Sequence, residues 1–248
     1  MWPEPERAPC SGAPVELVSI PGGTFVFRVE HRVREGRCPL FDHGPRPVTV
    51  RPFALGRYPV TNDQYATFLR QTAYQPADTR NFLRHWRDGV PPAGKGNHPV
   101  VWVSPRDAGA YCSWAGLRLP TDEEWQWAAQ GPDAGTWPWG DRFDPRRCHA
   151  SGLDTMPVDA FPAGAAPFGC LDMVGNTWEW TAPEWCDGWH YWRLLRGGSA
   201  FVAQGSVWYS EGGPRPATFH LRFLLMGEGL NRCATVGFRC AMDLPERG

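Results

Sequence analysis

Two acidic residues flank a short turn in the middle of the chain and could together hold a hard cation. Asp172 and Glu179 stand on either side of residues 173–178, which include Gly175. A glycine in such a turn lets backbone carbonyl groups point inward, because it adopts conformations that other residues avoid. Calcium binds this mixture of carboxylate and carbonyl oxygens. The alternative is that the two carboxylates cap turns or pair with arginines such as Arg196.

A second candidate site consists of histidines and carboxylates. We expect a groove between Arg196 and Arg232, and His190 and His220 flank it. Asp187 and Glu211 lie near them in sequence. Two imidazoles and one carboxylate hold iron in a family of oxygen-using enzymes. However, none of the seven histidines follows another at the spacing His-x-x-His or His-x-x-x-His. Lone histidines are more often packed or hydrogen-bonded than bound to metal, so this site is the less favoured interpretation.

The segment from Ala200 to Val236 has the composition of a binding surface. It is rich in aromatic residues and arginines and is interrupted by glycines. Binding energy at interfaces is concentrated in tryptophan, tyrosine and arginine side chains. Part of the segment, such as Phe219 and Phe223, is expected to be strand core. The residues that we expect to contact a ligand are Gln204, Trp208, Tyr209, Arg215, Arg222 and Arg232.

The composition restricts the class of protein and the class of partner. The 248 residues suit one sizeable domain, and 26 prolines and 28 glycines are typical of a loop-rich globular chain. A net charge of −1 gives no electrostatic reason to expect nucleic acid or an anionic membrane as partner. No apolar run reaches transmembrane length and no secretory signal is recognisable, so a cytoplasmic location is the default expectation. The eight cysteines include no Cys-x-x-Cys pair, which argues against a zinc knuckle.

The elements that must position these residues have clear start signals. Thr61 and Thr121 are each followed three residues later by Gln or Glu, which is a capping box, and Ser104 precedes a proline at the first helical position. Glycines at 116 and 131 predict the ends of the second and third helices.

Short β-prone runs dominate the rest of the chain. Residues 15–27 predict two strands around a Pro-Gly-Gly turn, and residues 48–55 predict another strand. Together with the helices, these runs predict an α+β domain over residues 15–248, preceded by a loose tail at residues 1–14.

Several segments, in order along the chain, resemble the formylglycine-generating-enzyme family, also called sulfatase-modifying factors. The resemblance covers nearly the whole chain and implies an α+β fold of the C-type-lectin-like type, loop-rich with a few helices. The segments that carry it are Ile20–Thr24, Arg51–Tyr65, His98–Ser104, Ala110–Trp125, Trp137–Asp141, Pro157–Phe161, Leu171–Trp180, Arg193–Ser199 and Gly237–Cys240.

The resemblance also implies one structural calcium ion. Its side-chain ligands would be Asp172 and Glu179, and its carbonyl ligands would be Met173, Gly175 and Thr177. Secreted relatives have a disulfide at the positions of two further cysteines. In a reducing compartment we expect these two to be packed thiols instead, namely Cys112 and Cys240.

The residues that do the chemistry in the oxidases of this family are missing. In those enzymes two cysteines bind copper, and the alignment of Arg196–Ser199 places Val202 and Val207 at their positions. Valine neither binds copper nor exchanges disulfides, so formylglycine generation by the known route is not expected. Cys233 lies in the corresponding C-terminal region and could enter the groove expected between Arg196 and Arg232, so it is a weak substitute.

Other branches of the family suggest two functions. In the variable proteins of diversity-generating retroelements, the segment between Arg-Gly-Gly-Ser and Gly-Phe-Arg carries the binding residues. We therefore expect a ligand-binding or peptide-binding module without the copper-binding cysteines. The alternative is an atypical oxidative enzyme, related to formylglycine-generating enzymes or ergothioneine-type sulfoxide synthases. It would use iron or copper held by His190, His220 and a carboxylate, either Asp187 or Glu211.

Overall fold

The three predicted helices begin where their capping residues indicate. The computed structural model describes residues 15–29, 44–186, 188–202 and 212–245. In it, α1 spans Asn62–Thr72, α2 spans Pro105–Trp114 and α3 spans Asp122–Gln130. Each begins with a complete capping box, in which the N-cap side chain accepts a hydrogen bond from the backbone N–H of the third helical residue. The helix positions are therefore confirmed and follow from local sequence.

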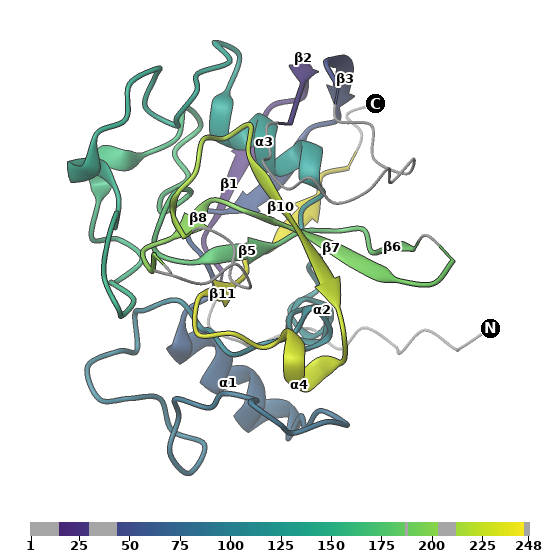
Figure 1. The fold of residues 1–248 in the computed structure, drawn as a ribbon, viewed down its shortest axis with the longest axis vertical. Helices are drawn as coiled ribbons and strands as arrows, with labels where there is room; N and C mark the ends of the chain where they lie inside the picture. Colours follow the sequence, from purple (N-terminus) through teal and green to yellow (C-terminus); the bar gives the residue numbers. More distant parts are fainter. Residues whose placement is uncertain (1–14, 30–43, 187, 203–211, 246–248) are drawn as a thin grey trace.

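The strands join distant parts of the chain. The larger sheet contains β5 (Trp178–Trp180), β6 (Trp185–Cys186), β7 (Tyr191–Arg196), β10 (His220–Leu225) and β11 (Val236–Gly237). Its order is β10–β7–β5–β11, with β6 added to β7 (Figure 1). A smaller sheet has the order β1 (Leu17–Ile20), β4 (Phe53–Gly56), β12 (Ala241–Asp243). The remaining elements are β2 (Gly23–Phe27) paired with β3 (Arg46–Val50), β8 (Gly198–Ser199) paired with β9 (Gly213–Pro214), the short helix α4 (Glu228–Asn231) and single turns at Pro145–Arg147 and Pro162–Gly164.

One sequence prediction about the strands is wrong. The single strand expected over residues 48–55 is split into β3 and β4, which pair with different partners. Pro52 lies at the break, and proline donates no hydrogen bond to a strand ladder. The two strands expected over residues 15–27 are confirmed as β1 and β2.

Two buried clusters hold the sheets and helices together. In Figure 1, α1, α2 and α4 lie below the larger sheet and α3 lies above it. The lower cluster joins α1 and α2 to the sheet, and the stacked rings of Tyr65 and Tyr111 pack in it with Trp180. The upper cluster joins α3 to the smaller sheet through Trp125 and Leu55. None of the helices in the described residues has the length and apolar character needed to span a bilayer.

Buried ion pairs fix the loops between these elements. Among the described residues, three arginines have fully buried side chains, each bound to a buried carboxylate. The guanidinium groups also donate to backbone carbonyls of loops that are far away in sequence. Because a buried charge is costly without its partner, each pair holds its loops in one arrangement. The pairs are Arg196 with Asp122, Arg232 with Asp107 and Arg239 with Glu179.

Candidate functional site

Two glycines after β7 precede Val202, the residue expected from the sequence at the position of the first copper-binding cysteine. Gly197 and Gly198 have positive φ angles of 86° and 82°, and a Cβ atom on Gly198 would lie 2.3 Å from the carbonyl oxygen of Gly213. Position 198 therefore needs glycine, because any side chain would prevent β8 from pairing closely with β9. Val202 follows and is 48% exposed, whereas Val207 lies outside the described residues. Val202 therefore presents an apolar side chain at the surface.

His220 is buried at one end of the β7–β10 pair, in an ion-paired network. Its Nδ1 lies 3.0 Å from Oδ2 of Asp122, and the same carboxylate binds Arg196 at 2.5 and 2.6 Å. Burial raises the pKa of Asp122, but the interactions with Arg196 and His220 together more than compensate and hold the pKa well below its ordinary value. We call this network, made of Asp122, Arg196 and His220, the inner network.

His190 and His220 are too far apart to hold one metal ion. His190 immediately precedes β7, while His220 pairs with Arg196 at the opposite end of that strand. Extended chain rises about 3.3 Å per residue, so six residues separate them by about 20 Å. Ligands of one iron or copper ion lie about 2 Å from it. The prediction that these two histidines bind one metal ion is therefore wrong. The candidate carboxylates of the predicted triad, Asp187 and Glu211, lie outside the described residues.

Three of the described thiols are poorly placed for metal chemistry. Cys233 is half-buried, and burial raises the pKa of its thiol to about 11, so little thiolate forms at neutral pH. Cys112 and Cys240 are thiols in the core, with their sulfur atoms 3.5 Å apart. Within the part of the chain that the structure describes, no three His, Cys, Asp or Glu side chains are grouped to hold a metal ion.

The arginines expected to contact a ligand have different environments. Arg232 is buried against an aspartate, so its predicted role at the binding surface is corrected to a structural one. Arg222 is half-buried, 3.7 Å from the ring centroid of Trp192, and Arg215 lies 4.9 Å from that of Phe219. The other predicted contacts lie outside the described residues, namely Gln204, Trp208 and Tyr209.

The two carboxylates of the predicted calcium turn have different partners. Both oxygens of Glu179 bind Arg239, at 2.6 and 2.7 Å. Asp172 instead accepts a hydrogen bond of 2.7 Å from the amide of Asn176, and burial raises its pKa to about 8. A cation would therefore be better accommodated at Asp172 than at Glu179, which already neutralises an arginine. The residues that would contribute carbonyl oxygens are buried between them, namely Met173, Gly175 and Thr177.

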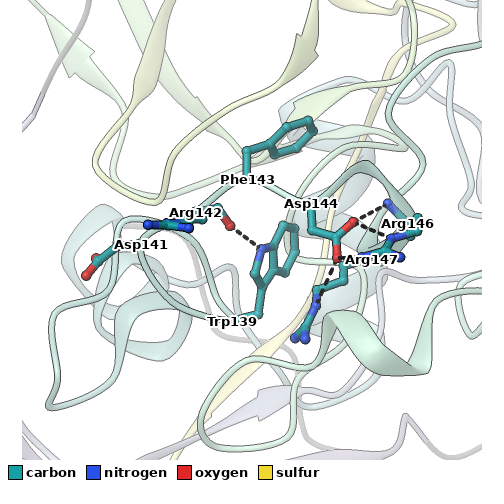
Figure 2. Close-up of a pocket in the computed structure, with 7 residues that line it drawn as sticks. All are labelled: Trp139, Asp141, Arg142, Phe143, Asp144, Arg146 and Arg147. Atoms are coloured by element: carbon teal, nitrogen blue, oxygen red, sulfur yellow. Dashed lines mark hydrogen bonds and ion pairs between the residues drawn. The ribbon is translucent and has the colours of Figure 1, made fainter.

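A pocket of about 460 Å³ lies in the loop around Trp139 (Figure 2). The carboxylate of Asp144 binds Arg146 at 3.0 Å and Arg147 at 3.6 Å, and Trp139 donates its indole N–H to the carbonyl of Arg142. All of its lining residues come from one stretch of chain, and its charges largely pair with one another. The loop pocket therefore has few polar groups left to recognise a ligand.

A second pocket, of about 410 Å³, lies at the other end of the β7–β10 pair from the inner network. We call it the outer pocket. Tyr191 and Leu225, which are opposite each other in register, line it together with Pro105, and Glu184 and Glu228 contribute carboxylates. No sequence motif marks this pocket, because its lining residues come from separate segments of the chain. The exposure of Tyr191, in a strand of mostly buried residues, is the local sign of such a surface.

Comparison with known proteins gives consistent matches over most of the chain. Residues 3–244 match the family described as sulfatase-modifying factor enzyme 1-like domain. The chain is 36% identical to inactive C-alpha-formylglycine-generating enzyme 2 of Mus musculus, over 77% of this chain and 76% of that protein. It is 37% identical to formylglycine-generating enzyme of Mycobacterium tuberculosis, over 68% of this chain and 74% of that protein.

Solved structures agree with the sequence matches. PvdO from Pseudomonas aeruginosa superposes with a TM-score of 0.68 at 25% identity, covering 95% of this chain and 96% of that one. Variable protein 1 of Treponema denticola has a TM-score of 0.60 at 19% identity, over 91% of this chain and 94% of that one, which shows a shared fold. The predicted C-type-lectin-like fold is thus confirmed. The chain belongs to the sulfatase-modifying factor family, the family of the formylglycine-generating enzymes.

Proposed function

We propose that this protein is a ligand-binding or peptide-binding member of its family that does not generate formylglycine through a cysteine pair. The observation that carries the proposal is Val202, which stands exposed where the family's oxidases have their first copper-binding cysteine. The relative from Mus musculus, 36% identical, is itself named an inactive enzyme, which supports a role without this chemistry.

The proposed binding face is the segment after β8. It includes Arg215 and Arg222, which are half-buried against aromatic rings. Gln204, Trp208 and Tyr209 belong to the same segment of the sequence and lie outside the described residues. Arginine and aromatic side chains of this kind form the anchors of many interfaces. A peptide or small molecule in the cytoplasm, rather than nucleic acid or membrane, is the partner class that the net charge of −1 favours.

The alternative, an iron-dependent or copper-dependent oxidative enzyme, has less support. Its two histidines are separated by the length of β7, and burial keeps the thiol of Cys233 protonated. A redox metal would need ligands other than the pair His190 and His220.

Oxygen consumption tests the first half of the proposal. The natural sequence and the double variant V202C/V207C are loaded with Cu(I) and supplied with a cysteine-containing peptide and a thiol reductant. We expect no peptide-dependent oxygen uptake by the natural sequence, because valine cannot bind the metal. Turnover by the natural sequence would refute the proposal, whatever the double variant does.

Peptide capture tests the second half. Peptides bound on an immobilised array are measured again with Trp208→Ala and Arg215→Ala, and with Leu153→Ala as a control at an exposed position in another loop. We expect the first two variants to lose capture at unchanged Tm, and the control to keep it. Full capture by both Trp208→Ala and Arg215→Ala would rule out this face.

We propose in addition that the turn at Asp172 binds one calcium ion. Asp172 would supply a carboxylate oxygen, and Met173, Gly175 and Thr177 would supply carbonyl oxygens. Glu179 would take part only through the carboxylate that already binds Arg239. Bound there, calcium would neutralise the buried carboxylate and hold the turn that precedes β5.

A further inference from the structure

The outer pocket combines an apolar wall with two carboxylates. The rings of Tyr191 and Pro105 and the side chain of Leu225 form the wall. The side chain of Glu184, 42% exposed, and that of Glu228, 15% exposed, lie among the same lining residues. An apolar surface next to acceptor oxygens suits a long side chain that ends in a positive charge.

The protein neutralises these carboxylates only in part. The ion pair of Glu184 with Arg193 is long, at 3.8 Å. Glu228 lies 3.4 Å from the buried Arg232 and 2.8 Å from Arg106, whose side chain is 78% exposed. Ion pairs made by exposed side chains contribute little to stability, so an incoming cation can readily replace Arg106.

We infer that the outer pocket binds an arginine or lysine side chain of a partner peptide. The inference rests on the binding function proposed above and specifies its partner. The aliphatic stem lies along Tyr191 and Leu225, and the charged head lies between Glu184 and Glu228 in place of Arg106. Guanidinium and ammonium groups favour such positions, over an aromatic face and against carboxylates.

Exposed apolar residues around the pocket favour a peptide over a free amine. Trp189, 88% exposed, precedes β7 by two positions, and Met226 and Leu230 flank the start of α4. Each lies within two residues of the pocket lining. Residues on either side of the peptide's cation can therefore contact apolar surface, which adds affinity that a small amine would lack.

An anionic ligand fits the outer pocket less well. The N-terminus of α2 borders it, but Pro105 has no N–H, and the capping box engages the N–H groups of Ser104 and Asp107. Arg106 is the one cationic residue among the lining residues, and it is paired with Glu228. The two carboxylates, Glu184 and Glu228, would also repel an anion in the pocket.

Fluorescence anisotropy with matched peptides tests the inference. The probes are two labelled nonapeptides with capped ends that differ only in a central arginine or glutamine between two leucines. We expect the arginine peptide to bind about tenfold more tightly than the glutamine peptide, since a charge-assisted hydrogen bond is lost in the second. Glu184→Gln and Glu228→Gln should each weaken the arginine peptide about fivefold and leave the glutamine peptide unchanged.

Arg106→Ala tests the inference through a gain in peptide affinity, which a damaged fold would not produce. Removing this arginine takes away the shorter of the two ion pairs of Glu228, so the arginine peptide should bind more tightly, by about threefold. Arg146→Ala, an exposed arginine of the loop pocket, changes the net charge equally and should have no effect. Weaker binding in Arg106→Ala, or equal affinity for the two peptides, would overturn the inference.

The outcome for the pocket can be separated from the outcome for the proposed function. Arginine-peptide binding that survives Glu184→Gln and Glu228→Gln but is lost in Trp208→Ala would leave the binding function standing and refute the outer pocket. Peptide-dependent oxygen uptake would refute the non-catalytic function without touching the anisotropy result.

Discussion

The two ends of the β7–β10 pair show opposite ways of using charge. At one end the inner network of Asp122, Arg196 and His220 is buried, and each carboxylate oxygen has a short contact with a cationic or imidazole nitrogen. At the other end the outer pocket leaves Glu184 and Glu228 beside open space. The same two strands therefore serve as structural support at one end and as a recognition surface at the other.

The difference shows why residue type alone is a poor guide to function in this chain. His220 is a candidate metal ligand by residue type, because histidine binds metals, but it is buried and its Nδ1 lies against the carboxylate of Asp122. Glu184 and Tyr191 carried no such prediction, yet they line a cavity. A functional group needs access as well as reactivity.

Removing the cation of the inner network should have the largest effect. Arg196→Met leaves Asp122 buried without its partner, and we expect a loss of about 3–5 kcal/mol in the free energy of unfolding, measured in urea. The double variant R196M/D122N should recover part of this loss, because it removes both charges. A loss below about 1 kcal/mol in the single variant would contradict the structural role of the network.

Calcium should have the next largest effect on stability. It would act at Asp172, whose carboxylate binds an amide rather than an arginine. At 100 times its Kd, calcium should raise the free energy of unfolding by about 2.7 kcal/mol. The Tm is compared in calcium and in chelator, for the natural sequence and for Asp172→Ala, which should lose the response. Equal Tm values in calcium and chelator for the natural sequence would exclude the proposed ion.

His85 allows the paired His220 to be compared with a half-buried histidine of another kind. Both ring nitrogens of His85 are buried without a hydrogen-bond partner, and burial, assisted by Lys95, lowers its pKa to about 4. The unfolded chain takes up this proton near pH 6.5, so stability falls as the pH drops from about 6.5 to about 4. Allowing for partial exposure, we expect a loss on the order of 1–2 kcal/mol from this residue.

His85→Leu isolates this contribution. Urea unfolding of the variant and of the natural sequence at pH 7 and pH 4.5 should give a shallower pH dependence for the variant. Identical slopes would mean that His85 titrates in the folded protein as it does in the unfolded chain.

Changes in the outer pocket should have the smallest effect on stability. Tyr191→Ala and Glu184→Gln alter exposed side chains, so we expect shifts within about 0.5 kcal/mol in the free energy of unfolding. Arginine-peptide affinity should fall in both. A loss of more than about 1 kcal/mol in Tyr191→Ala would show that this ring belongs to the core.

Local signals explain what could be predicted from the sequence. The capping boxes at Thr61 and Thr121 each lie within four residues, and both helices start there. The fold followed from many short segments that resemble one family. The break at Pro52 was also visible locally, because proline is disfavoured inside a strand, but the prediction ran one strand across it.

Long-range pairing explains what could not be predicted. Arg196 was considered as a partner for Asp172 or Glu179, but it binds Asp122, 74 residues away, and Glu179 binds Arg239. Nothing in the spacing of these residues distinguishes one carboxylate from another. The outer pocket could not be predicted for the same reason, since its walls meet only when α2, β7 and β10 are in place.

The order of the buried ion pairs along the chain has a consequence for synthesis. Each carboxylate precedes its arginine, by 74, 125 and 60 residues for Asp122, Asp107 and Glu179. On the ribosome, therefore, every one of these acids emerges well before the cation that neutralises it. The domain cannot close its loops until Arg239 has left the exit tunnel. A nascent chain of this protein should stay sensitive to protease until Arg239 has emerged.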